Sequence, residues 1–133
     1  GLEQVDVITT LIQESDIIAL HVHVTDETIG MINADCFKRM KKEVLLVNTS
    51  RGDVVNESDL VVFLSANPEA RVATDVLADE IRNRLASPLL QYAHQSEQVI
   101  ITPHIGGMSR EAQEIAYGHA GNLLQLFLKI YNP

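Results

Sequence analysis

Three side chains in this sequence, Arg51, Glu80 and His104, are of types that together can assist proton transfer at a carbonyl group. A guanidinium keeps its charge and can polarise a carbonyl oxygen, and a histidine tuned by a carboxylate can act as a general acid or base. A second acid, Asp75, precedes Glu80 by five positions. Each of these residues lies in or shortly after a short apolar segment, so the elements that carry them decide whether they meet.

The apolar segments predict four strands, over residues 16–22, 44–47, 71–76 and 98–103. Amphipathic segments predict helices over residues 7–13, 33–42, 56–66 and 109 to about 131. Asp6, Asn56 and Ser109 are candidate N-caps, and the cations near the end of the second helix suit its dipole. Segment 79–98 is polar, and we expect a loop over a site, with a short helix as the alternative for 84–98.

Strands that alternate with helices indicate parallel β-α-β units and an α/β fold. The strands are short and rich in Val and Ile, which is typical of strands covered on both faces. In open sheets of this kind, ligands bind beyond the carboxyl ends of the strands. The polar residues expected at that edge are His23, Asn48, Thr49, Ser50, Arg51, Asp75, Glu80, His104, Gly106 and Gly107.

The composition limits the class of protein. The chain has 133 residues, enough for one domain, and its formal net charge of −8 without a basic patch argues against nucleic-acid binding. No apolar run is long enough to cross a membrane, and we find no signal peptide. The single cysteine, Cys36, excludes an intrachain disulfide and fits a cytoplasmic location.

Four motifs resemble, in order and spacing, the D-isomer-specific 2-hydroxyacid dehydrogenases, with a phosphoglycerate dehydrogenase-like pattern. They are ESDIIALHVHVTDETIGMIN (14–33), VLLVNTSRGDVVNESDL (44–60), ATDVLADE (73–80) and ITPHIGGMSREAQ (101–113). The resemblance implies hydride transfer between NAD and C2 of a D-2-hydroxy or 2-keto acid, with NADP not excluded. It also implies a partial, doubly wound, Rossmann-like NAD-binding domain.

The resemblance implies a role for each catalytic candidate. Arg51 would bind the substrate carboxylate and polarise the keto oxygen, and His104 would exchange a proton with the 2-hydroxyl group. Glu80 would pair with His104 and raise its pKa. Proline is common in the family after this glutamate, whereas Ile81 stands here, so Asp79 is the alternative to Glu80.

The resemblance also implies a cofactor site. Residues 21–25 would lie along the adenosine end and ribose, residues 48–51 along the nicotinamide end, and Asp75 at the nicotinamide carboxamide. We expect no metal, because His21 and His23 would share a strand face but lack a third ligand. The residues expected at the cofactor are His21, Val22, His23, Thr25, Asn48, Thr49, Ser50, Asp75, Gly106 and Gly107.

The family's glycine-rich fingerprint and its substrate domain are not found in this sequence. Residues 1–133 therefore read as the C-terminal portion of an NAD-binding domain that lacks its first β-α-β half. The strand at 16–22 would then have an exposed edge, and we expect homodimerisation or other self-association through it. A non-catalytic, corepressor-like relative and an inactive truncated product are the alternative functions.

Each candidate also has a purely structural alternative. Arg51 could be a solvated loop charge, His104 a cap of the last helix, and Glu80 a surface acid. Asp75 could bond only to local backbone, and His21 and His23 could be structural.

Overall fold

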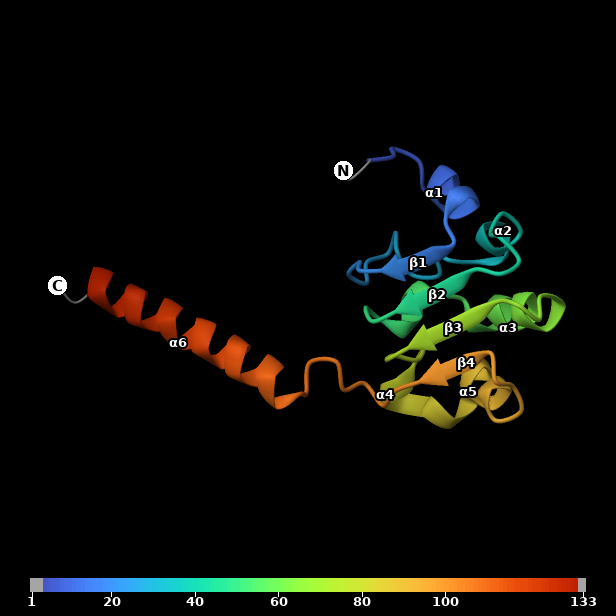
Figure 1. Ribbon diagram of the computed structural model, residues 1–133. Helices are drawn as coiled ribbons and strands as arrows, with labels where there is room; N and C mark the ends of the chain where they lie inside the picture. Colours follow the sequence, from blue (N-terminus) through green and yellow to red (C-terminus); the bar gives the residue numbers. More distant parts are fainter. Residues whose placement is uncertain (1–3, 132–133) are drawn as a thin grey trace. The chain divides into compact units, whose positions relative to one another are not determined.

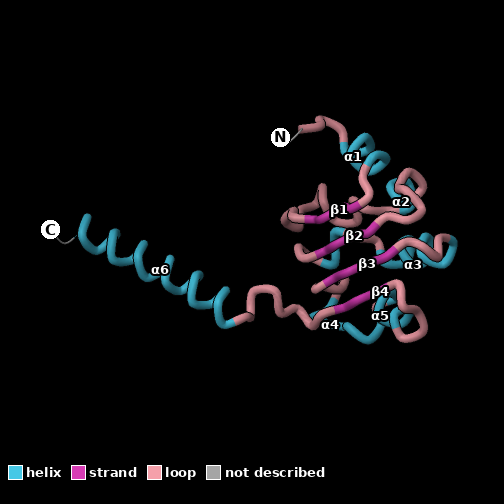
Figure 2. The backbone as a smooth tube through the Cα atoms, viewed as in Figure 1, coloured by secondary structure: helices cyan, strands magenta, loops and turns pink. Residues whose placement is uncertain are grey.

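The computed structural model describes residues 4–131 and divides into two compact units, Gly1–Pro103 and His104–Pro133. The first unit holds a parallel sheet of four strands in the order β1-β2-β3-β4 (Figure 1). The strands are β1 (Ile17–Leu20), β2 (Leu45–Asn48), β3 (Arg71–Thr74) and β4 (Val99–Ile101). Helical segments connect successive strands (Figure 2), as the predicted α/β class requires.

The helices of the first unit are mostly short. They comprise α1 (Ile8–Glu14), α2 (Ala34–Phe37), α3 (Glu57–Ala66), α4 (Glu80–Asn83) and α5 (Pro88–Ala93), with 3₁₀ turns η1 (Gly52–Val54) and η2 (Arg84–Ala86). The predicted cap Asn56 is confirmed, because its Oδ1 accepts a hydrogen bond from the N–H of Asp59 at 3.1 Å. Segment 79–98, predicted as a loop with a short helix as the alternative, contains α4, η2 and α5.

The core lies on one face of the sheet. Ile18, Leu46 and Val72 of the strands are buried with Leu60 and Leu64 of α3. On the opposite face, Ile17 is 63% exposed and Ile100 is 66% exposed. The expectation that the strands are covered on both faces is therefore wrong for the described residues, because burial alternates along each strand as in a sheet packed on one side.

Three strands end earlier than predicted, for identifiable reasons. Leu20 pairs with Asn48, the last residue of β2, so β1 has no partner strand beyond that level. His21 and His23 therefore follow the strand, and the prediction that they share a strand face is wrong. β3 ends at Thr74 because the Thr74 hydroxyl accepts a hydrogen bond from the Val76 N–H and turns the chain. β4 (Val99–Ile101) ends at Ile101, which pairs with Thr74, the last residue of β3.

Three predictions about the helices are also wrong. Residues 33–42 form only one turn of α-helix, because the N–H groups of Arg39 and Met40 both bond to the carbonyl of Cys36 and the chain then turns toward β2. Its last turn contains no cation. Asp6 does not cap α1, since Val7 occupies the N-cap position without a side-chain hydrogen bond.

The second unit consists of a turn and the helix α6 (Arg110–Tyr131). The Ser109 hydroxyl accepts a hydrogen bond from the Ala112 N–H at 3.2 Å, which confirms Ser109 as the predicted N-cap. Apolar side chains such as Leu123 and Phe127 are about half exposed, at 53% each. No helix within residues 4–131 combines the length and the apolar character that a membrane crossing requires.

Candidate active site

The carboxyl ends of the strands place several predicted site residues at one edge of the sheet. The register pairs Leu20 with Asn48 and Asn48 with Thr74, so β1, β2 and β3 end at the same level. Residues 21–25, 48–51 and 75 leave the sheet from this level. The first unit therefore confirms that these three polar segments share the edge where parallel sheets bind ligands.

The turn that carries Arg51 is organised by Asn48, which is only 3% exposed. The Asn48 Oδ1 accepts hydrogen bonds from the N–H and the hydroxyl of Ser50 at 3.0 and 2.9 Å, and its Nδ2 donates to the carbonyl of Arg51 at 2.9 Å. Asparagine favours such turns because its side chain can bond to backbone two residues ahead. Asn48 therefore fixes the backbone of the turn.

The Arg51 side chain is exposed at the end of this fixed turn. Its Nη1 donates to the carbonyl of Ser50 at 2.7 Å, the one hydrogen bond that this guanidinium makes within the described part of the chain. A guanidinium has five N–H donors in a planar fork that matches a carboxylate. Most of these donors therefore remain available to an anionic ligand.

A hollow of about 450 Å³ lies beside Arg51. It is lined by His21, Val22, His23, Val24, Thr49, Ser50 and Arg51. The structure thus brings together six of the predicted site residues, from the ends of β1 and β2. Two other predicted residues of the same two segments do not line this hollow: Asn48 is buried beneath the turn, and the N–H of Thr25 donates to the hydroxyl of Thr28 at 2.7 Å.

Asp75 lies in a neighbouring hollow of about 100 Å³ across β2, β3 and β4. The Asp75 N–H donates to the carbonyl of Asn48 at 3.0 Å, and its carboxylate accepts a hydrogen bond from the Thr102 hydroxyl. Asp75 is only 8% exposed, so the predicted site includes a largely buried acid. Thr49 lines both hollows, which makes them adjacent.

Glu80 begins α4 and is half-buried, and its Oε2 accepts a hydrogen bond from the Leu77 N–H at 3.1 Å. Asp79, the alternative acid, is exposed, pairs with Arg82 at 3.9 Å and has a positive φ of 49°. Neither acid lines the hollow beside Arg51. The choice of Glu80 over Asp79, and the pairing of either with His104, stay predictions.

His104 opens the second unit and is exposed, with a positive φ of 56°. A non-glycine residue in this region of φ is uncommon and is enriched at functional sites. Gly106 and Gly107 follow in the turn before α6. The meeting of His104 with Arg51 and Glu80 stays a prediction, as does any contact of the two glycines with a cofactor.

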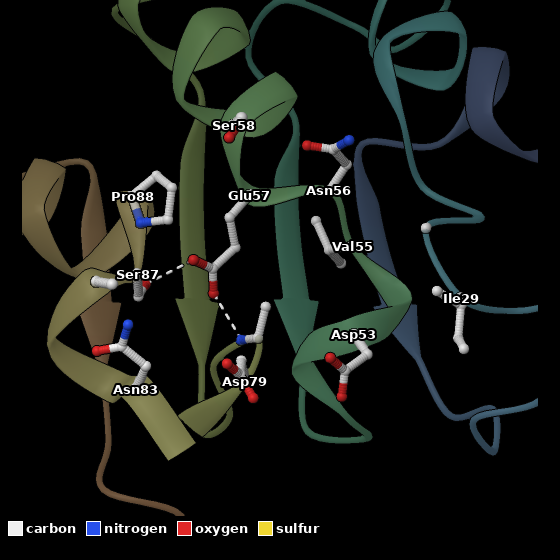
Figure 3. A pocket seen from close by; sticks show the side chains of 13 residues that line it. Ile29, Asp53, Val55, Asn56, Glu57, Ser58, Asp79, Asn83, Ser87 and Pro88 are labelled. Carbon is white, nitrogen blue, oxygen red and sulfur yellow. Dashed lines mark hydrogen bonds between the residues drawn. The ribbon is translucent and has the colours of Figure 1, made fainter. Parts of the chain in front are cut away.

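Two residues that support the site were not identified from the sequence. A Cβ on Gly52 would lie 1.9 Å from the carbonyl carbon of Leu77, so only glycine lets the turn after Arg51 approach the chain that leads to Glu80. Glu57 is 6% exposed, and its carboxylate bonds to Ala78 and Ser87 (Figure 3). The sequence feature that could have pointed to Gly52 is its position directly after Arg51. Acids are common in the first turn of a helix, so the sequence does not indicate that Glu57 is buried.

Within the described residues, no three His, Cys, Asp or Glu side chains are grouped so that they could hold a metal ion. The polar side chains that line the hollow beside Arg51 are instead hydroxyls, histidines and one arginine. Such groups suit an organic anion that is bound by hydrogen bonds.

Comparisons with known proteins agree with this geometry. A family model described as "D-isomer specific 2-hydroxyacid dehydrogenase, NAD binding domain" matches residues 1–106. The chain is 40% identical over 113 residues to D-3-phosphoglycerate dehydrogenase of Archaeoglobus fulgidus, covering 85% of this chain and 20% of that protein. It is 37% identical over 120 residues to hydroxypyruvate reductase of Blautia hydrogenotrophica, covering 90% of this chain and 35% of that protein.

A solved structure is also similar. A D-lactate dehydrogenase from Sporolactobacillus sp. superposes with a TM-score of 0.75 at 31% identity, covering 90% of this chain and 39% of that one. The chain thus spans well under half the length of each of these three relatives. Because the family model covers most of the chain, the protein belongs to the D-isomer specific 2-hydroxyacid dehydrogenase family, where it matches the NAD-binding domain.

Proposed function

We propose that this chain is the cofactor-binding part of an NAD-dependent dehydrogenase acting on a D-2-hydroxy or 2-keto acid. The observation that carries the proposal is the exposed Arg51 guanidinium, held on a turn fixed by buried Asn48 beside a hollow at the strand ends. The relatives named above carry activities on small hydroxy or keto acids in their names.

The residues at the sheet edge fit a nicotinamide nucleotide. The hollow of about 450 Å³ combines the apolar walls of Val22 and Val24 with the polar groups of Thr49 and Ser50. Its size lies in the usual range for ligand pockets, roughly 300–1,000 Å³. Asp75 lines the adjoining hollow and would accept a hydrogen bond from an amide of the cofactor. When bound, NAD would supply the hydride acceptor or donor.

Residues of the chain itself would then stabilise the charge that develops on the substrate and transfer its proton. In keto-acid reduction, negative charge develops on the C2 oxygen, and the fork of Arg51 donors would hold the carboxylate and stabilise that oxygen. His104 would donate a proton to the developing alkoxide, and Glu80 would be the carboxylate that pairs with His104. In the oxidation direction His104 would accept the hydroxyl proton.

The test uses the full-length protein that contains this chain. We expect NADH oxidation with a 2-keto acid, and we expect Arg51→Gln to lower kcat/KM by about 10²–10³-fold, as for loss of one charge-stabilising donor. NADH binding, followed by fluorescence, should change little. Unchanged turnover in Arg51→Gln would contradict the proposed role of Arg51. Loss of turnover with dimerisation intact would also separate an enzyme from a corepressor-like protein.

Three finer properties belong to the same proposal. NAD is favoured over NADP because the matching family model is described as NAD binding, and titrations with NADH and NADPH compare the two. Self-association through the β1 edge is supported by the place of β1 at the end of the described sheet, where it pairs only with β2, and would be contradicted by a monomer in sedimentation. The free thiol of Cys36 is consistent with the cytoplasm, which fractionation of cells checks.

A further inference from the structure

Glu57 is a buried acid that no part of the proposed mechanism uses. It is the first residue of α3 and is only 6% exposed. Its Oε1 accepts a hydrogen bond from the Ala78 N–H at 2.8 Å, and its Oε2 accepts from the Ser87 hydroxyl at 2.6 Å (Figure 3). Its Oε2 also accepts from the Leu89 N–H at 3.4 Å. Burying a carboxylate is unfavourable unless such donors compensate it. Three donors converge here from a distant part of the chain.

These donors lie on both sides of Glu80. Ala78 precedes Glu80 by two residues, and Ser87 and Leu89 follow it. Between them, α4 and η2 contribute no buried residue. The segment that carries Glu80 therefore has no core side chain of its own, and Glu57 holds it at both ends.

The same segment is also in contact with the Arg51 turn. Gly52 directly follows Arg51 and packs against the backbone of Leu77 and Ala78, so closely that a Cβ would overlap it. Glu57 is joined to Gly52 through η1 and the two residues after it. The Ala78 peptide is thus fixed from the Arg51 side by Gly52 and from the α3 side by Glu57.

We infer that Glu57 is a positioning residue that sets the place of Glu80 relative to Arg51. The inference rests on the function proposed above. Hydrogen bonds to an ionised acceptor are stronger than neutral ones, so a carboxylate suits this task better than an amide. Glu57 itself is buried and is not among the residues that line the hollow beside Arg51.

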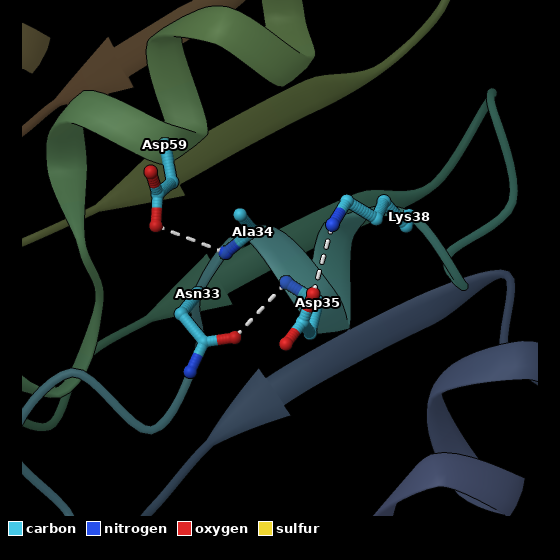
Figure 4. A network of polar contacts seen from close by, with 5 residues as sticks. All are labelled: Asn33, Ala34, Asp35, Lys38 and Asp59. Carbon is cyan, nitrogen blue, oxygen red and sulfur yellow. Dashed lines mark hydrogen bonds and ion pairs between the residues drawn. The ribbon is translucent and has the colours of Figure 1, made fainter.

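The first test compares two acids in the same turn of α3. Glu57→Gln in the full-length protein weakens the hold on segment 78–89. Asp59→Asn is the matched control, because Asp59 instead accepts from the Ala34 N–H at 2.9 Å and so contacts α2 (Figure 4). We expect Glu57→Gln to lower kcat by about 10–100-fold, as small misplacements of catalytic groups do, with KM within about threefold. Asp59→Asn should leave kcat within about twofold.

A second comparison separates positioning from general support. In a Glu80→Gln background, Glu57→Gln should have little further effect on kcat, because the residue that it positions has already lost its charge. An equal loss in both backgrounds, or no loss in either, would overturn the inference. If Glu57→Gln does not fold, Ser87→Ala removes one of the same bonds and should show a smaller change with the same dependence on Glu80.

Failure of the proposed function would look different. The unaltered full-length protein would then show no turnover with any 2-keto acid and either nicotinamide cofactor. That result overturns the enzyme proposal together with the role of Glu57. Turnover in the unaltered protein that is insensitive to Glu57→Gln overturns only the role of Glu57.

Discussion

Two neighbouring connections at the edge of the sheet are held in opposite ways. The turn after β2, residues 48–52, is fixed by hydrogen bonds that the Asn48 side chain makes within three residues of itself. The segment after β3, residues 75–86, depends on Glu57, which is 21 residues from Ala78 and 30 from Ser87. The first connection is held by bonds of one side chain within it, whereas the second has local bonds at Thr74 and Glu80 and also needs the distant bonds of Glu57.

The difference shows how a site can combine a group on a rigid turn, Arg51, with a group on an adjustable segment, Glu80. A local turn needs only its own sequence to form, so Arg51 has a fixed backbone once β2 is in place. A segment held through distant bonds takes its position from the whole unit and can change when those bonds change. The predictions below either break one connection or compare the two.

Breaking the contact between the two connections should have the largest effect. Gly52→Ala places a Cβ 1.9 Å from the carbonyl carbon of Leu77, against backbone that cannot turn aside. We expect the free energy of unfolding to fall by about 3 kcal/mol or more, at the upper end for overpacking. Urea unfolding measures the loss. Gly118→Ala is the control, because a Cβ there meets nothing within 4 Å, and a similar loss in both variants would contradict the explanation.

Removing the local support should cost less. Asn48→Ala removes three side-chain hydrogen bonds in a buried position and leaves the Arg51 carbonyl without that donor. We expect a loss of about 1–3 kcal/mol in the free energy of unfolding, again measured in urea. Thr49→Ala, at the exposed neighbour, should stay within about 0.5 kcal/mol. Equal effects at both positions would mean that Asn48 does not organise the turn.

The smallest effect on stability is expected for the exposed ion pair between Asp35 and Lys38, which tests whether a local contact stabilises the fold without burial. A hydrogen bond from Lys38, and then the charge of Lys38, lower the pKa of Asp35 below its ordinary value. Because folding lowers the pKa of Asp35, the pair stabilises the folded state at pH values above the ordinary carboxyl pKa. This stabilisation is lost as the pH falls through the lowered pKa. Lys38→Met should move the Asp35 pKa upward in an NMR titration while barely changing the unfolding midpoint at neutral pH. A large change of the unfolding midpoint at neutral pH would contradict this prediction, because it would show that an exposed local ion pair contributes strongly to stability.

Much of the fold follows from local sequence, and the exceptions follow from distant contacts. Alternating apolar and amphipathic segments predict the parallel sheet, and Asn56 predicts the start of α3. Periodicity does not reveal that residues 33–42 leave the helix after one turn, because the short path to β2 decides that. It also cannot show which face of the sheet is covered, since that depends on packing between elements.

The candidate site divides in the same way. Order along the chain places residues 21–25, 48–51 and 75 at one edge, since parallel strands end together there. The burial of Glu57 and the close approach at Gly52 come from residues more than twenty positions apart. No spacing rule joins Glu57 or Gly52 to the residues that each approaches, so only the folded chain shows these contacts.

The strand order also bears on how the protein is made. Each strand pairs with the one that precedes it along the chain, from β1 to β4. During synthesis, β2, β3 and β4 therefore each leave the ribosome after the strand with which they pair, and this part of the sheet can lengthen in the order of translation. The hold of Glu57 on Ala78, Ser87 and Leu89 closes only after β3 has been made. The Arg51 turn can thus form well before the segment that carries Glu80 is held in place.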